Sequence, residues 1–248
     1  MKKIESTQAG EVLLTLHPRH RLFEKAWNTY VRRRTPWMAL KDLRGKMFEK
    51  TLRMDNPKYW EALQGDSRMH LPPYPHDHVQ VVMNEVDRVT GRNVQASILD
   101  VGCNAGRLLQ AFYERGYVNL HGMDAQGAAL DHMRSLFPNM AAKARIKHAS
   151  FQDFFPTVTD RAFDVVCTWG ATIELVPPSF PICQEMARAA ARAVILVVNE
   201  GGHAYPRLWE TEFLRAGFLL TRVRRPYLSG MDSSLLVFER MTGGHDHF

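Results

Sequence analysis

The stretch Ile98-Leu-Asp-Val-Gly-Cys-Asn-Ala-Gly-Arg-Leu-Leu109 decides the expected fold. An apolar run leads to Asp100, and a glycine-containing turn then enters a helix predicted over 107–115. Gly102 and Gly106 have no Cβ, so the chain can turn sharply and the helix can start close to the strand. Asp100 falls at the carboxyl end of the strand, where open α/β sheets bind their ligands. The stretch therefore predicts a strand–loop–helix unit whose backbone a ligand can approach.

A second acid ends the next predicted strand, Val118-Asn-Leu-His-Gly-Met-Asp124. Asp124 lies eighteen residues after Gly106, near the roughly 20-residue spacing at which a strand-end acid reaches a ribose hydroxyl. The alternative is that Asp124 caps the helix predicted over 127–137. The spacing of Gly102 and Gly106 alone matches neither the dinucleotide fingerprint nor a phosphate-binding loop. The prediction of a nucleoside site therefore depends on the second acid.

On these residues the chain resembles the class I S-adenosylmethionine-dependent methyltransferases over about residues 77–241. The segment 98–106 is similar to the first motif of that family, and Met123-Asp124 is similar to its ribose-binding acid. Ser150-Phe-Gln-Asp-Phe154 resembles the segment whose Asp meets the adenine amino group. The segment 163–174 resembles the fourth strand and the loop that follows it.

Two positions depart from the family pattern. Asn104 stands where the family usually has Gly, and Leu175 stands where many relatives have His. Because Asn tolerates a left-handed backbone, we expect the turn to survive. The resemblance implies S-adenosyl-L-methionine as the cofactor. It also implies that the cofactor is bound by Asp100, Gly102, Cys103, Asn104, Gly106, Asp124, Ala125, Asp153, Phe154 and Thr168.

Strands alternate with helices along the remaining chain, which favours a doubly wound sheet. Further strands are predicted over 145–149, 163–168, 193–198, 218–225 and 233–240, and further helices over 79–89, 179–192 and 205–216. The last two strands are joined by a short turn and suggest an antiparallel hairpin. The resemblance implies seven strands. The expected fold is thus α/β: a mostly parallel, Rossmann-like seven-stranded sheet with an antiparallel edge hairpin and an N-terminal helical cap.

The basic charge lies before this fold. Residues 1–97 contain 17 Lys and Arg against 11 Asp and Glu, a net charge of +6, whereas residues 98–248 contain 15 of each. Amphipathic helices are predicted over 19–34 and 38–54. The prolines of 71–75 then stop the helices. We therefore expect two domains: a basic helical cap or lid, 1–76, and a methyltransferase domain, 77–248.

The arginines of the cap have two interpretations. They form the solvated face of helices that pack on the sheet domain, or they contact an anionic partner such as RNA, an acidic small molecule or a membrane surface. The aromatic residues Trp27 and Tyr30 fall on the apolar side, which does not favour base stacking with nucleic acid.

The composition indicates the compartment in which we expect the protein to work. No apolar run approaches the roughly 18 residues of a transmembrane helix, and the N-terminus lacks the apolar core of a secretory signal. Three cysteines, at 103, 167 and 183, form no Cys-x-x-Cys pair. These features favour a reduced cytoplasmic protein without a zinc site.

Two candidate catalytic residues follow the predicted fourth and fifth strands. Methyl transfer is an in-line displacement that needs alignment in a dry site, and a base is needed only when the nucleophile must lose a proton. Glu174 is a candidate base, with helix capping as the alternative. His203 follows Gly201-Gly202 on a turn that we expect to be flexible, and an imidazole can act as a base near neutral pH; a plain surface histidine is the alternative.

The remaining candidates concern the substrate. Trp169 forms a pocket wall or belongs to the core. His76 and His78, predicted on a loop, are candidate pocket residues, and they lack the third ligand of a metal site. The loop after the fourth strand reads Thr168-Trp-Gly-Ala instead of an Asn/Asp-Pro-Pro-Tyr motif, which by resemblance disfavours planar amines. We therefore expect methylation of a hydroxyl on a small molecule or glycan. The alternatives are an RNA methyltransferase and a non-catalytic cofactor-binding partner subunit.

Overall fold

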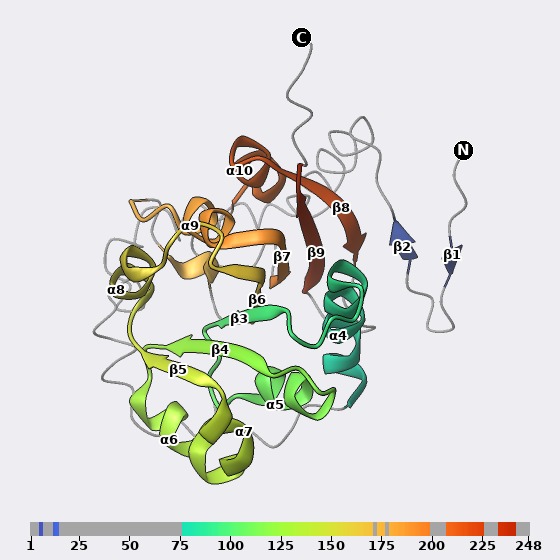
Figure 1. Ribbon diagram of the computed structural model, residues 1–248. Helices are drawn as coiled ribbons and strands as arrows, with labels where there is room; N and C mark the ends of the chain where they lie inside the picture. Colours follow the sequence, from blue (N-terminus) through green and yellow to red (C-terminus); the bar gives the residue numbers. More distant parts are fainter. Residues whose placement is uncertain are drawn as a thin grey trace, which may run out of the picture.

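The computed structural model describes residues 5–6, 12–14, 76–170, 173–176, 179–198, 207–225 and 233–241 (Figure 1). For 5–6, 12–14 and 76–78 it describes the backbone alone. The described strands form one sheet in the order β1-β2-β8-β9-β7-β6-β3-β4-β5.

Five strands of this sheet run parallel to one another: β3 (Ser97–Val101), β4 (Asn119–Asp124), β5 (Arg145–His148), β6 (Phe163–Trp169) and β7 (Ala190–Val198). Two further strands pair antiparallel, β8 (Phe218–Arg224) and β9 (Ser234–Arg240). β9 lies between β7 and β8 and is antiparallel to both. The predicted seven-stranded, mostly parallel sheet with its antiparallel pair is confirmed.

The sheet has two additional short strands that were not predicted. β1 (Glu5–Ser6) pairs with β2 (Val12–Leu14), and β2 pairs antiparallel with β8. Both fall in the segment predicted as a helical cap, so that segment is not helical throughout. The helices predicted over 19–34 and 38–54 lie outside the described residues, and the division into two domains stays a prediction.

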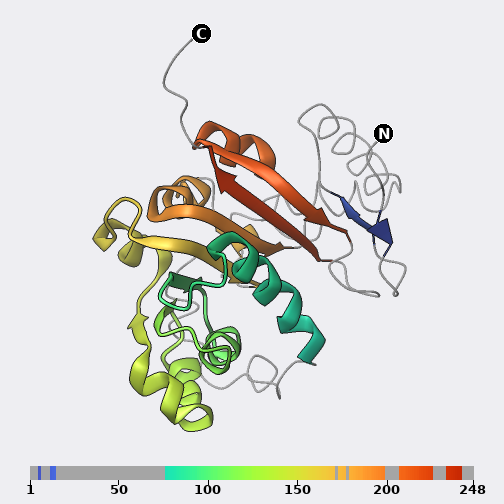
Figure 2. The same ribbon diagram turned by 45° about the vertical axis from the view of Figure 1, so that its right-hand side comes forward.

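Helices cover both faces of the sheet (Figures 1 and 2). One face carries α4 (His76–Thr90), α5 (Arg107–Glu114), α6 (Gly127–Leu136) and α7 (Pro138–Lys143). The other carries α8 (Phe151–Phe154), α9 (Ile182–Ala189) and α10 (Trp209–Arg215). The helix predicted over 179–192 is shorter than expected, because Ala190 already pairs with Phe163 and residues 190–192 extend β7.

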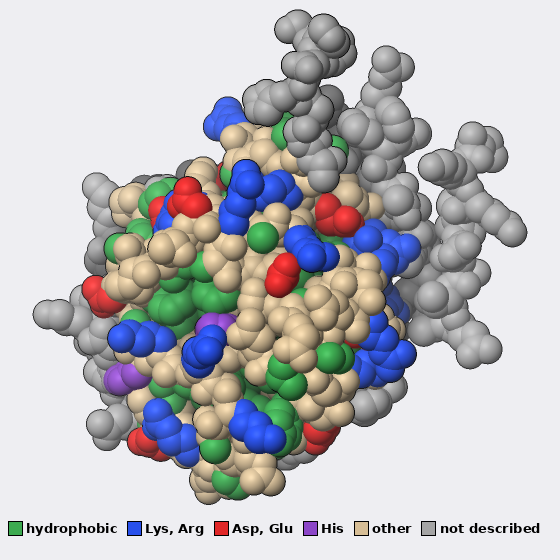
Figure 3. Space-filling view, viewed as in Figure 1, with side chains coloured by type: hydrophobic (Ala, Val, Ile, Leu, Met, Phe, Trp, Pro, Cys, Tyr) green, Lys and Arg blue, Asp and Glu red, His purple; other side chains and the backbone are tan. Residues whose placement is uncertain are grey.

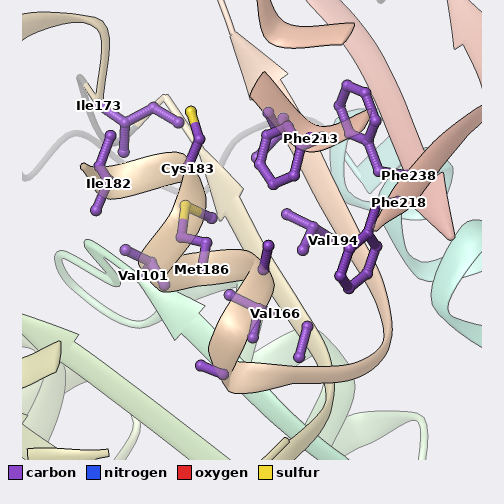
Figure 4. Close-up of a cluster of buried hydrophobic side chains, with 14 of the residues drawn as sticks. Val101, Val166, Ile173, Ile182, Cys183, Met186, Val194, Phe213, Phe218 and Phe238 are labelled. Atoms are coloured by element: carbon purple, nitrogen blue, oxygen red, sulfur yellow. The ribbon is translucent and has the colours of Figure 1, made fainter. Parts of the chain in front are cut away.

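Apolar side chains from the strands fill the space beneath the helices. Figure 4 shows the face under α9 and α10, where Val166 and Val194 of the central strands lie beside Met186. Phe213 of α10 stacks on Phe238 of β9 with ring centroids 4.4 Å apart. Buried on both faces, β6 and β7 contain the apolar runs 165–167 and 193–198, as central parallel strands do.

The carboxyl ends of the parallel strands and the N-termini of α5 and α6 meet at one edge of the sheet. This is the edge at which open α/β sheets bind ligands. Among the described residues, no helix combines the length and apolarity that crossing a membrane requires.

Candidate active site

Three residues of the loop between β3 and α5 have a left-handed backbone conformation. Gly102, Asn104 and Gly106 have φ of 72°, 47° and 74°. Asn104 thus adopts the conformation expected of it, since Asn is among the few residues with a Cβ that tolerate it. The backbone N–H groups of Gly102 and Cys103 both donate to the carbonyl of Met123, each at 2.9 Å. The loop is therefore fixed against the end of β4.

Gly106 is required where α5 begins. A Cβ on this residue would lie 2.6 Å from Met133 Cγ and 2.7 Å from Met133 Sδ, both on α6. Such distances are far inside van der Waals contact. The glycine therefore allows α5 to start directly against the side chain of Met133 on α6.

Asp124 joins the loop between β3 and α5 to the N-terminus of α6. Its Oδ2 accepts a hydrogen bond from the backbone N–H of Asn104, and its Oδ1 accepts one from that of Gln126, both at 2.8 Å. Burial raises the pKa of Asp124, while these bonds and the nearby His148 act to lower it. The N-cap of α6 is Gln126 and not Asp124. Each carboxylate oxygen keeps a lone pair that can accept a ribose hydroxyl.

Asp100 is a buried carboxylate with no hydrogen-bond partner among the described residues. It is 3% exposed, and its neighbours across β6 and β4 are Cys167 and Gly122. Burial, and then the charge of Asp124, raise the pKa of Asp100 to about 8. Asp100 lies within electrostatic reach of the thiols of Cys103 and Cys167, whose pKa values burial also raises. A cationic group beside Asp100 would stabilise the ionised carboxylate in place of the water that burial removes.

The predicted adenine-side residues lie after β5. Asp153 is in the first turn of α8, where it accepts a hydrogen bond from Ser150 Oγ at 2.6 Å. Phe154 is buried and meets the ring of Phe155 edge-on at 5.5 Å. Ala125 follows Asp124, and its carbonyl lies 3.0 Å from His148 Nε2.

The end of β6 brings together three more predicted residues. Thr168 is 1% exposed, and its Oγ1 has no hydrogen-bond partner in the described part of the chain. Trp169 is half-buried against the cluster beneath α4 and α5. Glu174, in a short 3₁₀ helix (Ile173–Leu175), is 4% exposed. A buried carboxylate near the end of β6 is suited to proton transfer in a site that excludes water.

The three candidate histidines lie at two places in the sequence. His203 lies outside the described residues. His76 and His78 were predicted on a loop, and this is wrong: α4 begins at His76, directly after the proline-rich stretch. The two residues occupy the first turn of that helix, and their side chains are not among those described.

Further buried polar atoms at this edge were not predicted. The Ser234 Oγ, beside the end of β7, has no partner among the described residues, and neither does the Trp209 Nε1 at the start of α10. The same is true of Gln126 Nε2. Buried polar atoms without partners are uncommon and call for a ligand or ordered water. The sequence held one signal, a Gln at the start of α6 where Ser, Thr, Asp or Asn is usual.

Comparison with known proteins assigns this arrangement to a family. Residues 98–193 match a family model described as a methyltransferase domain. The chain contains a methyltransferase domain. With the strand order above, this match confirms the resemblance to the class I S-adenosylmethionine-dependent methyltransferases. No curated protein matches the chain.

Solved structures support the fold of this methyltransferase domain. Magnesium protoporphyrin IX methyltransferase of Synechocystis PCC 6803, with bound SAH, is 14% identical with a TM-score of 0.55, covering 81% of this chain and 99% of that one. A Galdieria sulphuraria protein assigned as a sarcosine dimethylglycine methyltransferase is 13% identical with a TM-score of 0.53, covering 65% and 84%. At such identities the likeness concerns the fold alone.

The residues of this site fit the methyl donor of the class, S-adenosylmethionine. The donor carries an ammonium and a sulfonium group, and Asp100 offers a buried carboxylate without a partner among the described residues. The donor also carries a ribose. Asp124 is held at the end of β4, and its carboxylate oxygens keep lone pairs that can accept hydrogen bonds from the ribose hydroxyls.

Proposed function

We propose that this methyltransferase transfers the methyl group of S-adenosylmethionine to a hydroxyl of a small molecule or glycan. The observation that supports this most is the end of β6, where Thr168-Trp169-Gly170 is followed by the buried carboxyl group of Glu174. A hydroxyl must lose its proton when it attacks the methyl group, and a carboxylate in a dry site can accept that proton.

The chain supplies binding, alignment and proton transfer. Asp124 accepts the ribose hydroxyls, Asp153 faces the adenine amino group, and Asp100 balances the positive charge of the donor. The displacement moves that charge off sulfur, so a water-excluding site and fixed alignment contribute most to the rate. Glu174 is our candidate base, and His203 is the second candidate.

The charge on the face seen in Figure 3 also favours a small acceptor over RNA. Figure 3 shows Lys and Arg side chains scattered over this face with Asp and Glu among them, without one continuous basic stripe. A continuous basic surface is the usual footprint of nucleic-acid binding. The basic segment before residue 76 keeps its role as a proposed cap or lid. The three cysteines are buried free thiols, which supports the expectation of a reducing, cytoplasmic setting.

The test uses S-adenosylmethionine with a tritiated methyl group. The full-length protein is incubated with separated small-molecule, glycan and RNA fractions, and labelled products are treated with alkali. We expect label in a small-molecule or glycan product that survives alkali, as a methyl ether does. Label in RNA, or alkali-labile methyl esters, would overturn the proposed acceptor. Binding of SAH with no label in any fraction would favour the non-catalytic partner subunit.

A further inference from the structure

The N-terminus of α6 carries a residue that does not cap the helix. N-cap positions favour Ser, Thr, Asp and Asn, whose short side chains accept hydrogen bonds from the first turn. Gln126 occupies this position in an extended conformation, and its side chain makes no capping bond. The side-chain amide of Gln126 therefore does not cap α6, although it stands at the N-cap position.

The same side chain is buried at a cost. Gln126 is 4% exposed, and its Nε2 finds no acceptor among the described residues. A buried N–H donor without an acceptor is unfavourable, and native proteins rarely keep one without a reason. An acceptor on a bound ligand would provide that reason.

The turn around Gln126 is held in place from two sides. Its backbone N–H donates to Asp124 Oδ1 at 2.8 Å. On the other side, His148 Nε2 lies 3.0 Å from the carbonyl of Ala125, and a Cβ on Gly127 would lie 3.2 Å from the His148 ring. The backbone of Gln126 is thus fixed beside the carboxylate that we assign to the ribose, and its buried side chain extends from this point.

The chemistry of a ribose hydroxyl requires two kinds of partner. A hydroxyl donates one hydrogen bond and accepts others, whereas an ionised carboxylate only accepts. Asp124 can take the protons of the ribose hydroxyls and leaves their oxygen lone pairs without a donor. We propose that Gln126 Nε2 donates to a ribose hydroxyl oxygen of S-adenosylmethionine, so that Asp124 and Gln126 bind the hydroxyl pair together. This inference rests on the proposed cofactor site.

The test is a cycle of variants and ligands measured by calorimetry. Gln126→Met keeps the size of the side chain and removes the donor. We expect it to weaken binding of SAH about fivefold to tenfold. One of the two analogues, 2′-deoxy-SAH or 3′-deoxy-SAH, lacks the oxygen that accepts from Gln126. For that analogue the dissociation constants of the variant and the wild type should agree within about twofold, since the partner atom is already missing. Gln80→Met, on the exposed side of α4, is the matched control and should leave SAH binding unchanged.

A second readout separates binding from a structural role. Removing a buried donor without a partner should leave the melting temperature of the ligand-free protein unchanged or raise it by about 2–4 °C. A lower melting temperature, unchanged affinity for SAH, or an equal loss for SAH and both deoxy analogues would overturn the inference. If the wild-type protein does not bind SAH, the proposed function fails, and the inference fails with it.

Discussion

Replacing Asp100 by Asn should stabilise the ligand-free protein increasingly as the pH rises. Burial, and then Asp124, raise the pKa of Asp100 from 3.8 to about 8. Between these values the folded protein holds a proton that the unfolded chain releases. The free energy of unfolding therefore falls by about 1.4 kcal/mol for each pH unit in this range. The loss begins near pH 4, is on the order of 4 kcal/mol at pH 7 and is complete above pH 8.

The sign follows from the raised pKa. Stability associated with Asp100 is fully present at low pH, where the carboxyl is protonated in both states, and declines as the pH rises toward the folded-state value. Asn has the same shape and does not titrate. The free energy of unfolding of Asp100→Asn, minus that of the wild type, should therefore grow by about 1 kcal/mol per unit between pH 5 and 8.

Urea unfolding at pH 5, 6, 7 and 8, without ligand, measures this difference. Asp131→Asn, at an exposed carboxylate on α6, is the control and should show no comparable trend. Parallel stability curves for wild type and Asp100→Asn across this range would refute the reasoning, because they would mean that Asp100 keeps an ordinary affinity for protons.

Three further predictions concern single positions of the site. Asp124→Ala should weaken SAH binding by about 1–3 kcal/mol through lost ribose hydrogen bonds, and calorimetry showing unchanged affinity would remove Asp124 from the site. Gly106→Ala should lower the free energy of unfolding by about 1–3 kcal/mol, since φ is 74° and the new Cβ meets Met133. In the double variant with Met133→Ala, urea unfolding should show a loss smaller than the sum of the two single losses, whereas additive losses would contradict the proposed clash. Glu174→Gln should reduce kcat for a hydroxyl acceptor about 100-fold with little change in SAH affinity, and an unchanged kcat would transfer the role of base to His203.

The fold could be predicted wherever local pattern and local structure coincide. The apolar strand, the glycine turn and the helix of 98–109 are adjacent in sequence, so the β3–loop–α5 unit was predictable. The shortening of α9 was not, because residues 190–192 join β7 by pairing with a strand far away in the sequence. The addition of β2 to β8 depends on the same kind of distant pairing.

The candidate site divides in the same way. Asp100 and Asp124 were recognisable because an acid that ends an apolar strand is a local pattern. The burial of Gln126 was not, since it depends on how α6 packs against the sheet. His76 and His78 were assigned to a loop because prolines precede them, yet α4 starts immediately after the last of these prolines.

A crystal structure of the full-length protein with SAH tests the central claim most directly. We predict one SAH at the carboxyl edge of β3 and β4, with its ribose hydroxyls on Asp124 and its amino group beside Asp100. SAH bound elsewhere on the molecule, or no bound SAH at millimolar concentration together with no heat of binding in calorimetry, would contradict the assignment.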